Sequence, residues 1–163
     1  MTKAASKGLT HVAEDGSARM VDVSAKADTA RMARATGAIS MSEETLRTIV
    51  ANSVAKGDVL AVARLAGIMA AKRTADLIPL CHPIALTSVA VTLTADARLP
   101  GVRVEAVVRS VGKTGVEMEA LTAVTVALLT VYDMAKALDR AMVLLEVALA
   151  EKTGGVGGAY ARP

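Results

Sequence analysis

Residues 89–106, VAVTLTADARLPGVRVEA, decide the fold class of this chain. Val89, Val91 and Leu93 alternate with small or polar residues, and the same alternation resumes at Val102 and Val104 after a Leu-Pro-Gly turn. Two segments with a period of two residues, joined by a short turn, predict a β-hairpin.

The sequence after the hairpin predicts one long helix and one more strand. The segment from Thr114 to about Leu138 is apolar around its middle, which is typical of a helix that is buried on most sides. Residues 142–150 then predict the last strand.

Two helices are predicted before the hairpin. Ser40 and Glu43 stand at capping-box spacing ahead of an apolar-periodic segment. Asp58 can cap a second helix, which ends near Lys72 and Arg73. The order helix, helix, strand, strand, helix, strand indicates an α+β sandwich with helices packed on one face of an antiparallel sheet.

The remaining segments are expected to be irregular parts of a single domain, residues 1–163. Residues 1 to about 40 are polar and alanine-rich, and we expect a largely irregular arm with one strand at 19–23. Two prolines make residues 75–83 irregular. Residues 153–163 form a Gly-rich tail.

Composition excludes several classes of protein. The chain has 163 residues, a length typical of one domain, and its single cysteine, Cys81, excludes a disulfide framework and multi-cysteine metal motifs. No apolar run reaches the length of a membrane span, and the N-terminus lacks a signal-peptide segment, so we expect a cytoplasmic protein. Hydrophobic residues make up 53% without any Phe or Trp, which suggests closely packed helices and apolar surface between subunits. A net charge of +3 fits an anionic partner, but the scarcity of aromatic residues argues against nucleic acid.

The stretch Leu77-Ile78-Pro79-Leu80-Cys81-His82-Pro83 combines stiffness with reactive side chains. Its prolines restrict the backbone around an imidazole and a thiol, so the segment can form the wall of a ligand site. A buried connection with a satisfied histidine and an inert thiol explains the same residues. No second Cys/His pair accompanies them, so we expect no metal site.

The long helix carries carboxylates at both ends. Thr114 and Glu117 stand at capping-box spacing, which gives Glu117 a structural explanation that Glu119 lacks. Asp133 follows the most apolar stretch of the chain, and Lys136 lies one turn later, either as a simple ion pair or as a proton-transfer partner. Glu119 and Asp133 are nearly four full turns apart, so they share a helix face, and we expect Asp133 to be a buried carboxylate with a tuned pKa.

Basic residues recur beside turns and helix ends. Lys72 and Arg73 sit where a helix C-terminus favours cations, whereas Lys56 precedes a helix N-terminus, where the dipole gives a cation no benefit. Arg31 and Lys152 are further candidates, the latter beside glycines that can present amides to an anion. The residues alone indicate a site for a polyanionic small molecule without identifying it.

The chain resembles the MoaC family of cyclic pyranopterin monophosphate synthases at these same residues. The matching blocks run through almost the whole chain: MVDVSAK at 20–26, KGDV at 56–59, DLIPLCHP at 76–83, KTGVEMEALTA at 113–123 and YDM-KA at 132–137. The resemblance implies a ferredoxin-like subunit and a homohexamer built as a trimer of dimers, with sites near subunit interfaces. It also implies a lyase of molybdenum cofactor (molybdopterin) biosynthesis, which converts a cyclised dihydro-GTP into cyclic pyranopterin monophosphate and releases pyrophosphate. No metal or organic cofactor is expected.

The resemblance also implies roles for particular residues. Asp133 matches the catalytic aspartate of the family, and Lys56 and Lys136 match its catalytic lysines. Position 156 departs from the family, which usually has a basic residue where this chain has Val156. The substrate-binding matches are Leu80, Cys81, His82, Met118 and Glu119, with Glu117, Arg31, Lys72, Arg73 and Lys152 as further positions.

Two other classes remain alternatives to the enzyme. A non-catalytic nucleotide-binding paralogue would keep the fold and the pocket, and Val156 leaves that alternative open. An RNA-binding module of the same α+β class is disfavoured by the missing aromatics and by the carboxylates in the candidate site.

Overall fold

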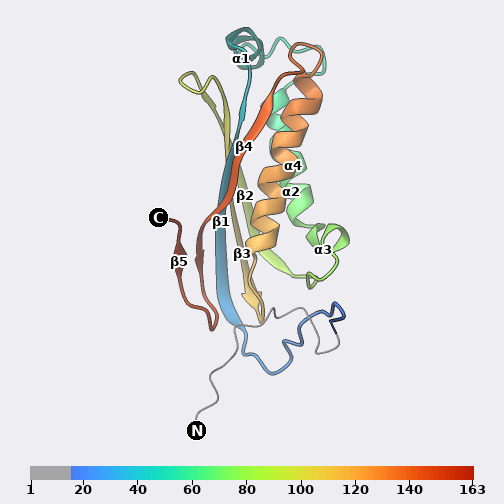
Figure 1. Cartoon of the computed structure of the whole chain (residues 1–163), viewed down its shortest axis with the longest axis vertical. Helices are drawn as coiled ribbons and strands as arrows, with labels where there is room; N and C mark the ends of the chain where they lie inside the picture. Colours follow the sequence, from blue (N-terminus) through green and yellow to red (C-terminus); the bar gives the residue numbers. More distant parts are fainter. Residues whose placement is uncertain (1–15) are drawn as a thin grey trace.

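The computed structural model of the chain describes residues 16–163, in which a five-stranded antiparallel sheet carries two long helices on one face (Figure 1). The strands lie in the order β2-β3-β1-β4-β5. The elements along the chain are β1 (Thr29–Ser40), α1 (Glu43–Val50), α2 (Val59–Ala71), α3 (Thr74–Leu77), β2 (Leu86–Asp96), β3 (Gly101–Gly112), α4 (Glu117–Ala135), β4 (Val143–Thr153) and β5 (Tyr160–Ala161).

The predicted hairpin is present as β2 and β3, which pair antiparallel from Leu86↔Ser110 to Asp96↔Gly101. On its other side β3 pairs with β1 over twelve residues, and β4 pairs with the opposite edge of β1. The α+β prediction is therefore confirmed, and the β-α-β-β-α-β order is compatible with a ferredoxin-like fold.

Small residues bring the two long helices together over the sheet. Ala63, Ala123 and Ala127 are fully buried, and α2 passes α4 so closely that a Cβ at Gly67 would lie 2.9 Å from the carbonyl oxygen of Ala123. Helix α4 is long and apolar enough to cross a membrane, but over half of it is buried in the protein, as in the core helix of a globular domain. The composition thus fills a core that contains no large aromatic ring among the described residues.

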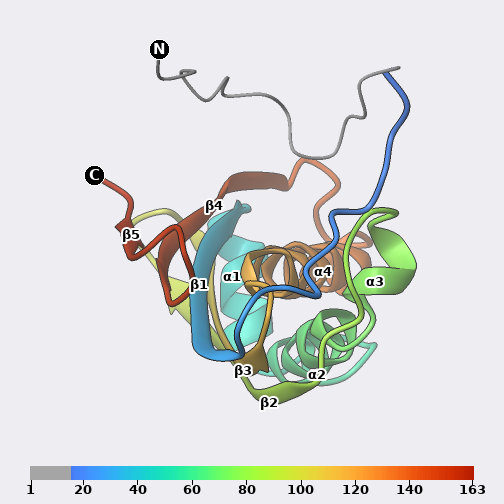
Figure 2. The same ribbon diagram turned by 90° about the horizontal axis from the view of Figure 1, so that it is seen from below.

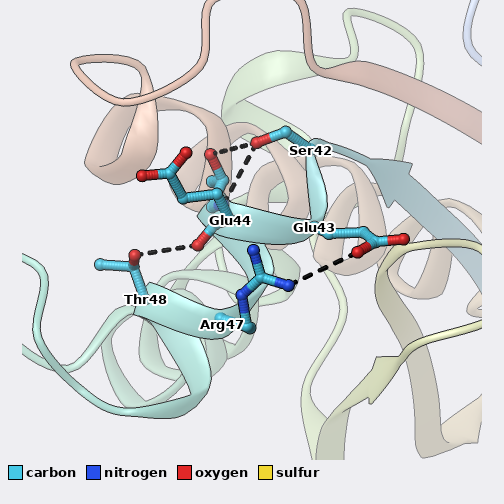
Figure 3. A network of polar contacts seen from close by, with 6 residues as sticks. Ser42, Glu43, Glu44, Arg47 and Thr48 are labelled. Carbon is cyan, nitrogen blue, oxygen red and sulfur yellow. Dashed lines mark hydrogen bonds and ion pairs between the residues drawn. The ribbon is translucent and has the colours of Figure 1, made fainter.

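The predicted N-terminal cap is confirmed for α2, whereas those predicted for α1 and α4 are wrong. Asp58 caps α2 through a 2.9 Å bond from the Ala61 amide, as predicted. Helix α1 is capped by Ser42, whose hydroxyl accepts from Thr45 (Figure 3), so the predicted Ser40–Glu43 capping box is wrong. Ser40 is instead the last residue of β1, where it pairs with Gly101, so strand pairing prevents it from capping the helix.

Helix α4 lacks the predicted capping box as well. Its N-cap position is Val116 and not Thr114, and no side chain caps it. The Glu117 carboxylate lies 3.4 Å from Lys152 Nζ. The helix itself, predicted from Thr114 to Leu138, is confirmed over Glu117–Ala135.

The N-terminal arm is shorter than predicted. Strand β1 lies in the middle of the sheet at Thr29–Ser40, so residues 29–40 are not irregular. Residues 19–23 form no strand. The positions of β1 that point into the core include small residues, such as Ala33 and Ala35, which alternate with Arg34 and Thr36. The strand therefore lacks the β-branched residues that are typical of an inner strand.

Two other boundaries also differ. Helix α3 (Thr74–Leu77) precedes the first proline, so the first three residues of the segment 75–83, which was predicted to be irregular, are helical. Within the tail at 153–163, Tyr160–Ala161 pairs with β4 as β5. Residues 1–15 of the predicted arm lie outside the described residues.

Candidate functional site

Lys56, Asp133 and Lys136 form a group, here called the lysine cluster. It lies at the C-terminal end of α4, beside the loop between α1 and α2 (Figure 1). Lys56 Nζ lies 2.9 Å from Asp133 Oδ2 and donates to the Asp133 carbonyl oxygen at 2.8 Å. Lys136 Nζ lies 2.7 Å from the other carboxylate oxygen, Oδ1. One carboxylate therefore holds two ammonium groups that are eighty residues apart in sequence, a count given by positions 56 and 136.

Asp133 is exposed within the subunit, so the expectation of a buried carboxylate is wrong. Its side chain is 58% exposed. The hydrogen bonds from Lys136 and Lys56, with their charges, lower the Asp133 pKa to about 2. The carboxylate therefore stays ionised near neutral pH and acts as an anchor for the lysines, which are left to carry protons.

The main pocket lies at the opposite, N-terminal end of α4. It is a cavity of about 550 Å³, and its wall includes the predicted segment 80–82 together with Glu117, Met118 and Glu119. The structure thus brings together six of the predicted substrate-binding residues from two separate sequence blocks. Helix α3 ends at Leu77, and Pro79 and Pro83 prevent the chain from continuing as a helix. The segment 80–82 is therefore non-helical where it lines the main pocket.

A strap formed by residues 18–28 runs beneath this end of α4 towards α3 (Figure 2). His82 Nε2 lies 2.8 Å from the carbonyl oxygen of Val21, and Lys113 Nζ donates to the carbonyl oxygen of Ser24 at 2.7 Å. Val21, Val23 and Lys26 of the strap line the main pocket. Sequence reasoning did not place these strap residues in a site, because no local pattern links an irregular segment to a histidine sixty positions away.

Two groups in the main pocket have pKa values raised by burial. Glu119 is 4% exposed, and burial, followed by the charge of Glu117, raises its pKa. Burial also raises the pKa of the Cys81 thiol, and the charge of Glu119 raises it further. Glu119 is therefore a group that can hold a proton for a ligand, whereas Cys81 is disfavoured as a thiolate nucleophile.

A second cavity, here called the basic recess, adjoins the main pocket and measures about 180 Å³. Arg31 and Lys152 line it, and Lys152 Nζ lies 3.4 Å from Glu117 Oε1. Gly115 and Gly155 have no room for a side chain, because the Glu117 carboxylate and the Arg31 guanidinium occupy those spaces. Val156, at the position where the family usually has a cation, lines the recess and is 95% exposed.

Two of the predicted site residues lie elsewhere. Lys72 lines a separate cavity between α2 and β2. Arg73 pairs with Asp76 at 3.2 Å on the surface. Neither residue joins the lysine cluster, the main pocket or the basic recess within one subunit.

The lysine cluster and the main pocket are far apart in a single chain. Fourteen residues of α4 separate Glu119 from Asp133, and at about 1.5 Å per residue this spans roughly 21 Å. The predicted common face did not bring them into one site, since Glu119 is buried and Asp133 is exposed. Among residues 16–163, no group of three His, Cys, Asp or Glu side chains is placed to hold a metal ion.

An α+β sandwich with a carboxylate-anchored pair of lysines, and with a separate pocket that contains His82 and Glu119, indicates the class of small acid–base enzymes. The comparisons make this class specific. The family model described as "MoaC family" matches residues 20–155, and the chain belongs to this family.

Three curated relatives share the same name, "Cyclic pyranopterin monophosphate synthase". The relative from Dinoroseobacter shibae is 61% identical over 94% of this chain and 97% of its own length. Those from Heliobacterium modesticaldum and a Methylobacterium species are 60% and 63% identical, again over 94% of this chain, and over 97% and 96% of their own lengths.

Proposed function

We propose that this protein is a cyclic pyranopterin monophosphate synthase, a lyase that rearranges a cyclised dihydro-GTP and expels pyrophosphate during molybdenum cofactor biosynthesis. Identity of about 60% to relatives of that name over nearly the full length supports the proposal. The observation that carries it is the lysine cluster, in which Asp133 positions both Lys56 and Lys136.

The chemistry follows from these groups. Opening and re-forming rings requires side chains that give and take protons, and positioned lysines do this when a fixed carboxylate holds them in place. In this proposal Lys56 and Lys136 transfer protons, while Asp133 orients them. The main pocket holds the ring system, and His82 with the basic residues positions the phosphates and stabilises the charge that develops on pyrophosphate.

A complete site requires a second copy of the chain. The lysine cluster and the main pocket are roughly 21 Å apart along α4, which exceeds the reach of one small substrate. One stripe runs along α4 with a cluster or pocket at each end: Met118, Leu129 and Asp133 are exposed in it, and Leu121 and Thr125 are half-buried.

A two-fold contact along this stripe would bring the two halves together. If two copies pack α4 antiparallel, Asp133 of one copy lies over Met118 of the other, and each pair of copies contains two composite sites. This arrangement supports the homohexamer, a trimer of dimers, that we propose for this protein in the cytoplasm.

Direct turnover tests the function. The purified protein would receive the cyclised dihydro-GTP, and pyrophosphate release would be measured together with the fluorescent pterin obtained by oxidising the product. We expect both products in equal amounts, and a loss of turnover with an intact assembly in Lys56→Ala and Lys136→Ala. Near-normal turnover in both variants would remove the assignment of the lysines.

Val156 supports a second candidate, a paralogue that binds the substrate but turns it over weakly. The expected outcome for this candidate is binding of the intermediate without turnover by the folded assembly, and a gain of affinity in Val156→Lys.

A further inference from the structure

Asp139 joins the turn after α4 to the start of α1, and Figure 1 shows both at the same end of the molecule. Its Oδ2 accepts from the backbone amide of Ser42 at 2.8 Å, and its Oδ1 accepts from the amide of Ala141 at 2.8 Å. Ser42 and Asp139 are 97 positions apart in the sequence, so only the folded chain makes this contact. Asp139 is not among the residues to which the family resemblance gives a role.

The contact supplies half of the cap of α1. In a capping box, the side chain of the third helical residue accepts from the amide of the N-cap residue. Here the N-cap is Ser42 and the third helical residue is Thr45, whose hydroxyl is bonded to the Ser42 hydroxyl at 2.9 Å. Asp139 accepts from the Ser42 amide, and its negative charge is favourable at the N-terminal end of the helix dipole. Because α1 has only eight residues, its start depends on this contact with the turn after α4.

The turn that carries Asp139 is tied to the end of α4. Lys136 is the C-cap residue of α4, and the Asp139 amide donates to the carbonyl oxygen of Ala135 at 3.2 Å. The Tyr132 hydroxyl donates to the carbonyl oxygen of Arg140 at 3.2 Å, which closes the turn back onto the helix. Asp139 therefore keeps a fixed place relative to Lys136.

Backbone hydrogen bonds also connect α1 to the segment that carries Lys56. At the end of α1, the Ser53 amide donates to the carbonyl oxygen of Thr48 at 3.0 Å. A tight turn follows, in which the Gly57 amide donates to the carbonyl oxygen of Val54 at 2.9 Å. The residues on both sides of Lys56 thus belong to a turn that is continuous with α1, so a displacement of α1 moves the Lys56 ammonium group relative to α4.

We propose that Asp139 is a positioning residue for the lysine cluster, because it holds the start of α1 against the turn that follows Lys136. The inference rests on the proposed function for the reaction that the lysines serve, and the link itself rests on the contacts described above. Lys56 and Lys136 lie on the two segments that Asp139 joins, and both must meet Asp133 at the same time. Without the link each lysine keeps its charge, but the distances within the cluster are no longer fixed, and a displacement of about 1 Å can lower a rate about 100-fold.

Steady-state kinetics of Asp139 variants test the effect on the reaction. In Asp139→Ala we expect kcat to fall about 10- to 100-fold while KM stays within about twofold of the parent value, because the main pocket is unchanged. Asp139→Asn keeps one oxygen that can accept from the Ser42 amide, so its kcat should stay within about fivefold of the parent value. The matched control is Asp96→Ala, since the Asp96 carboxylate likewise accepts from an amide two residues later, that of Arg98 at 2.9 Å. Its kcat should stay within about twofold.

Hydrogen–deuterium exchange of the full-length protein tests the link without requiring turnover. In Asp139→Ala we expect the amides of residues 51–58 to exchange at least about threefold faster than in the parent, whereas those of β2 and β3 keep their rates. Asp96→Ala should leave the exchange of residues 51–58 unchanged. If Asp139→Ala does not fold, Asp139→Asn takes its place in both measurements, with a smaller change in the same direction.

The outcomes separate the two proposals. A parent protein that does not turn over the cyclised substrate contradicts the synthase, whereas faster exchange at residues 51–58 in the Asp139 variants still supports the link between α1 and α4. Unchanged exchange at residues 51–58 overturns the link. In an active parent, the positioning role is overturned by an unchanged kcat in Asp139→Ala, by a rise in KM alone, or by an equal loss of kcat in Asp96→Ala.

Discussion

At the scale of single residues, the two oxygens of Asp133 each hold a different lysine, so one substitution releases both. In Asp133→Asn the amide keeps the shape but not the charge, and we expect turnover to fall by about 100-fold or more. The side chain is exposed, so we expect the free energy of unfolding to stay close to that of the parent. Turnover and urea denaturation measure the two effects, with Glu43→Gln, which breaks a surface ion pair in α1, as the control.

The pKa of Asp133 also predicts how pH affects the lysine cluster. Because its folded-state pKa is lowered to about 2, the carboxylate keeps its charge, and the ion pairs persist, above about pH 4. They are lost only as the pH falls towards 2. A pH–rate profile should therefore show no acid limb from this group between pH 5 and 7, and such a limb disappearing in Asp133→Asn would contradict the assignment.

The pKa of Glu119 is shifted in the opposite direction to that of Asp133. Burial raises its pKa, so the folded protein binds this proton more tightly than the unfolded chain, and its contribution to stability falls as pH rises from the ordinary Glu value through the raised one. Glu119→Gln removes this loss, so we expect the variant to be more stable than the parent at pH 8 but not at pH 4. Denaturant unfolding at the two pH values tests this, and the exposed Glu44→Gln should show no such difference. Parallel pH dependences of parent and Glu119→Gln would count against it.

At the scale of the elements, β4 contains a strained position. Glu146 has φ of 51°, in a bulge where the register of β4 against β1 shifts between Thr36 and Ala38. Glycine adopts this conformation without the steric cost that a side chain imposes, so Glu146→Gly should stabilise the protein by up to about 1 kcal/mol. Thermal and urea unfolding measure the change, and Ala148→Gly in the same strand should instead lose stability. A loss in both variants would show that the bulge is not strained.

Local signals account for the elements that the sequence predicted well. The β2–β3 hairpin has alternation and a turn within one short segment, and α2 has a capping aspartate followed by apolar periodicity. Strand β1 has neither, because most of its buried positions are small, such as Ala33, Ala35 and Gly37, and these fit under α4 only once the sheet has formed. Residues 29–40 therefore form a strand because they pair with β3 and β4, and local propensity gives no information about this pairing.

The candidate site shows the same limit. The residue types in segment 80–82 and in the first turn of α4 pointed to a ligand wall, and the structure places them in one cavity. Three-dimensional placement decided the rest: Lys26 and Lys113 meet in the basic recess, Lys72 lies in another cavity, and Asp133 is exposed. Helical spacing did not predict the environment of either carboxylate, because Glu119 is buried and Asp133 is exposed.

At the scale of the whole molecule, the outer side of the helical layer exposes several large apolar side chains. Val62, Leu65 and Met69 of α2 and Leu129 of α4 are between 44% and 59% exposed. A charge at the centre of such a face should prevent association, so Leu129→Glu is expected to yield smaller, inactive particles with unchanged helical content. Light scattering with circular dichroism tests this, and a full-size active assembly would exclude the α4 stripe from the interface.

Composite sites make a sharper prediction, because two inactive variants should then repair each other. Asp133→Asn damages the lysine cluster and His82→Ala damages the main pocket, so each variant alone has no complete site. In a mixed two-fold pair, one site combines the intact cluster of one copy with the intact pocket of the other, while the second site carries both defects. Random re-association after mild dissociation should therefore restore turnover to about a quarter of the parent level, since half of the pairs are mixed and half of their sites are intact. Two controls accompany the mixture: each variant taken through the same dissociation alone, and Asp133→Asn mixed with Lys136→Ala, whose defects lie in the same half. If each chain instead holds a complete site of its own, no mixture will exceed the activity of its components.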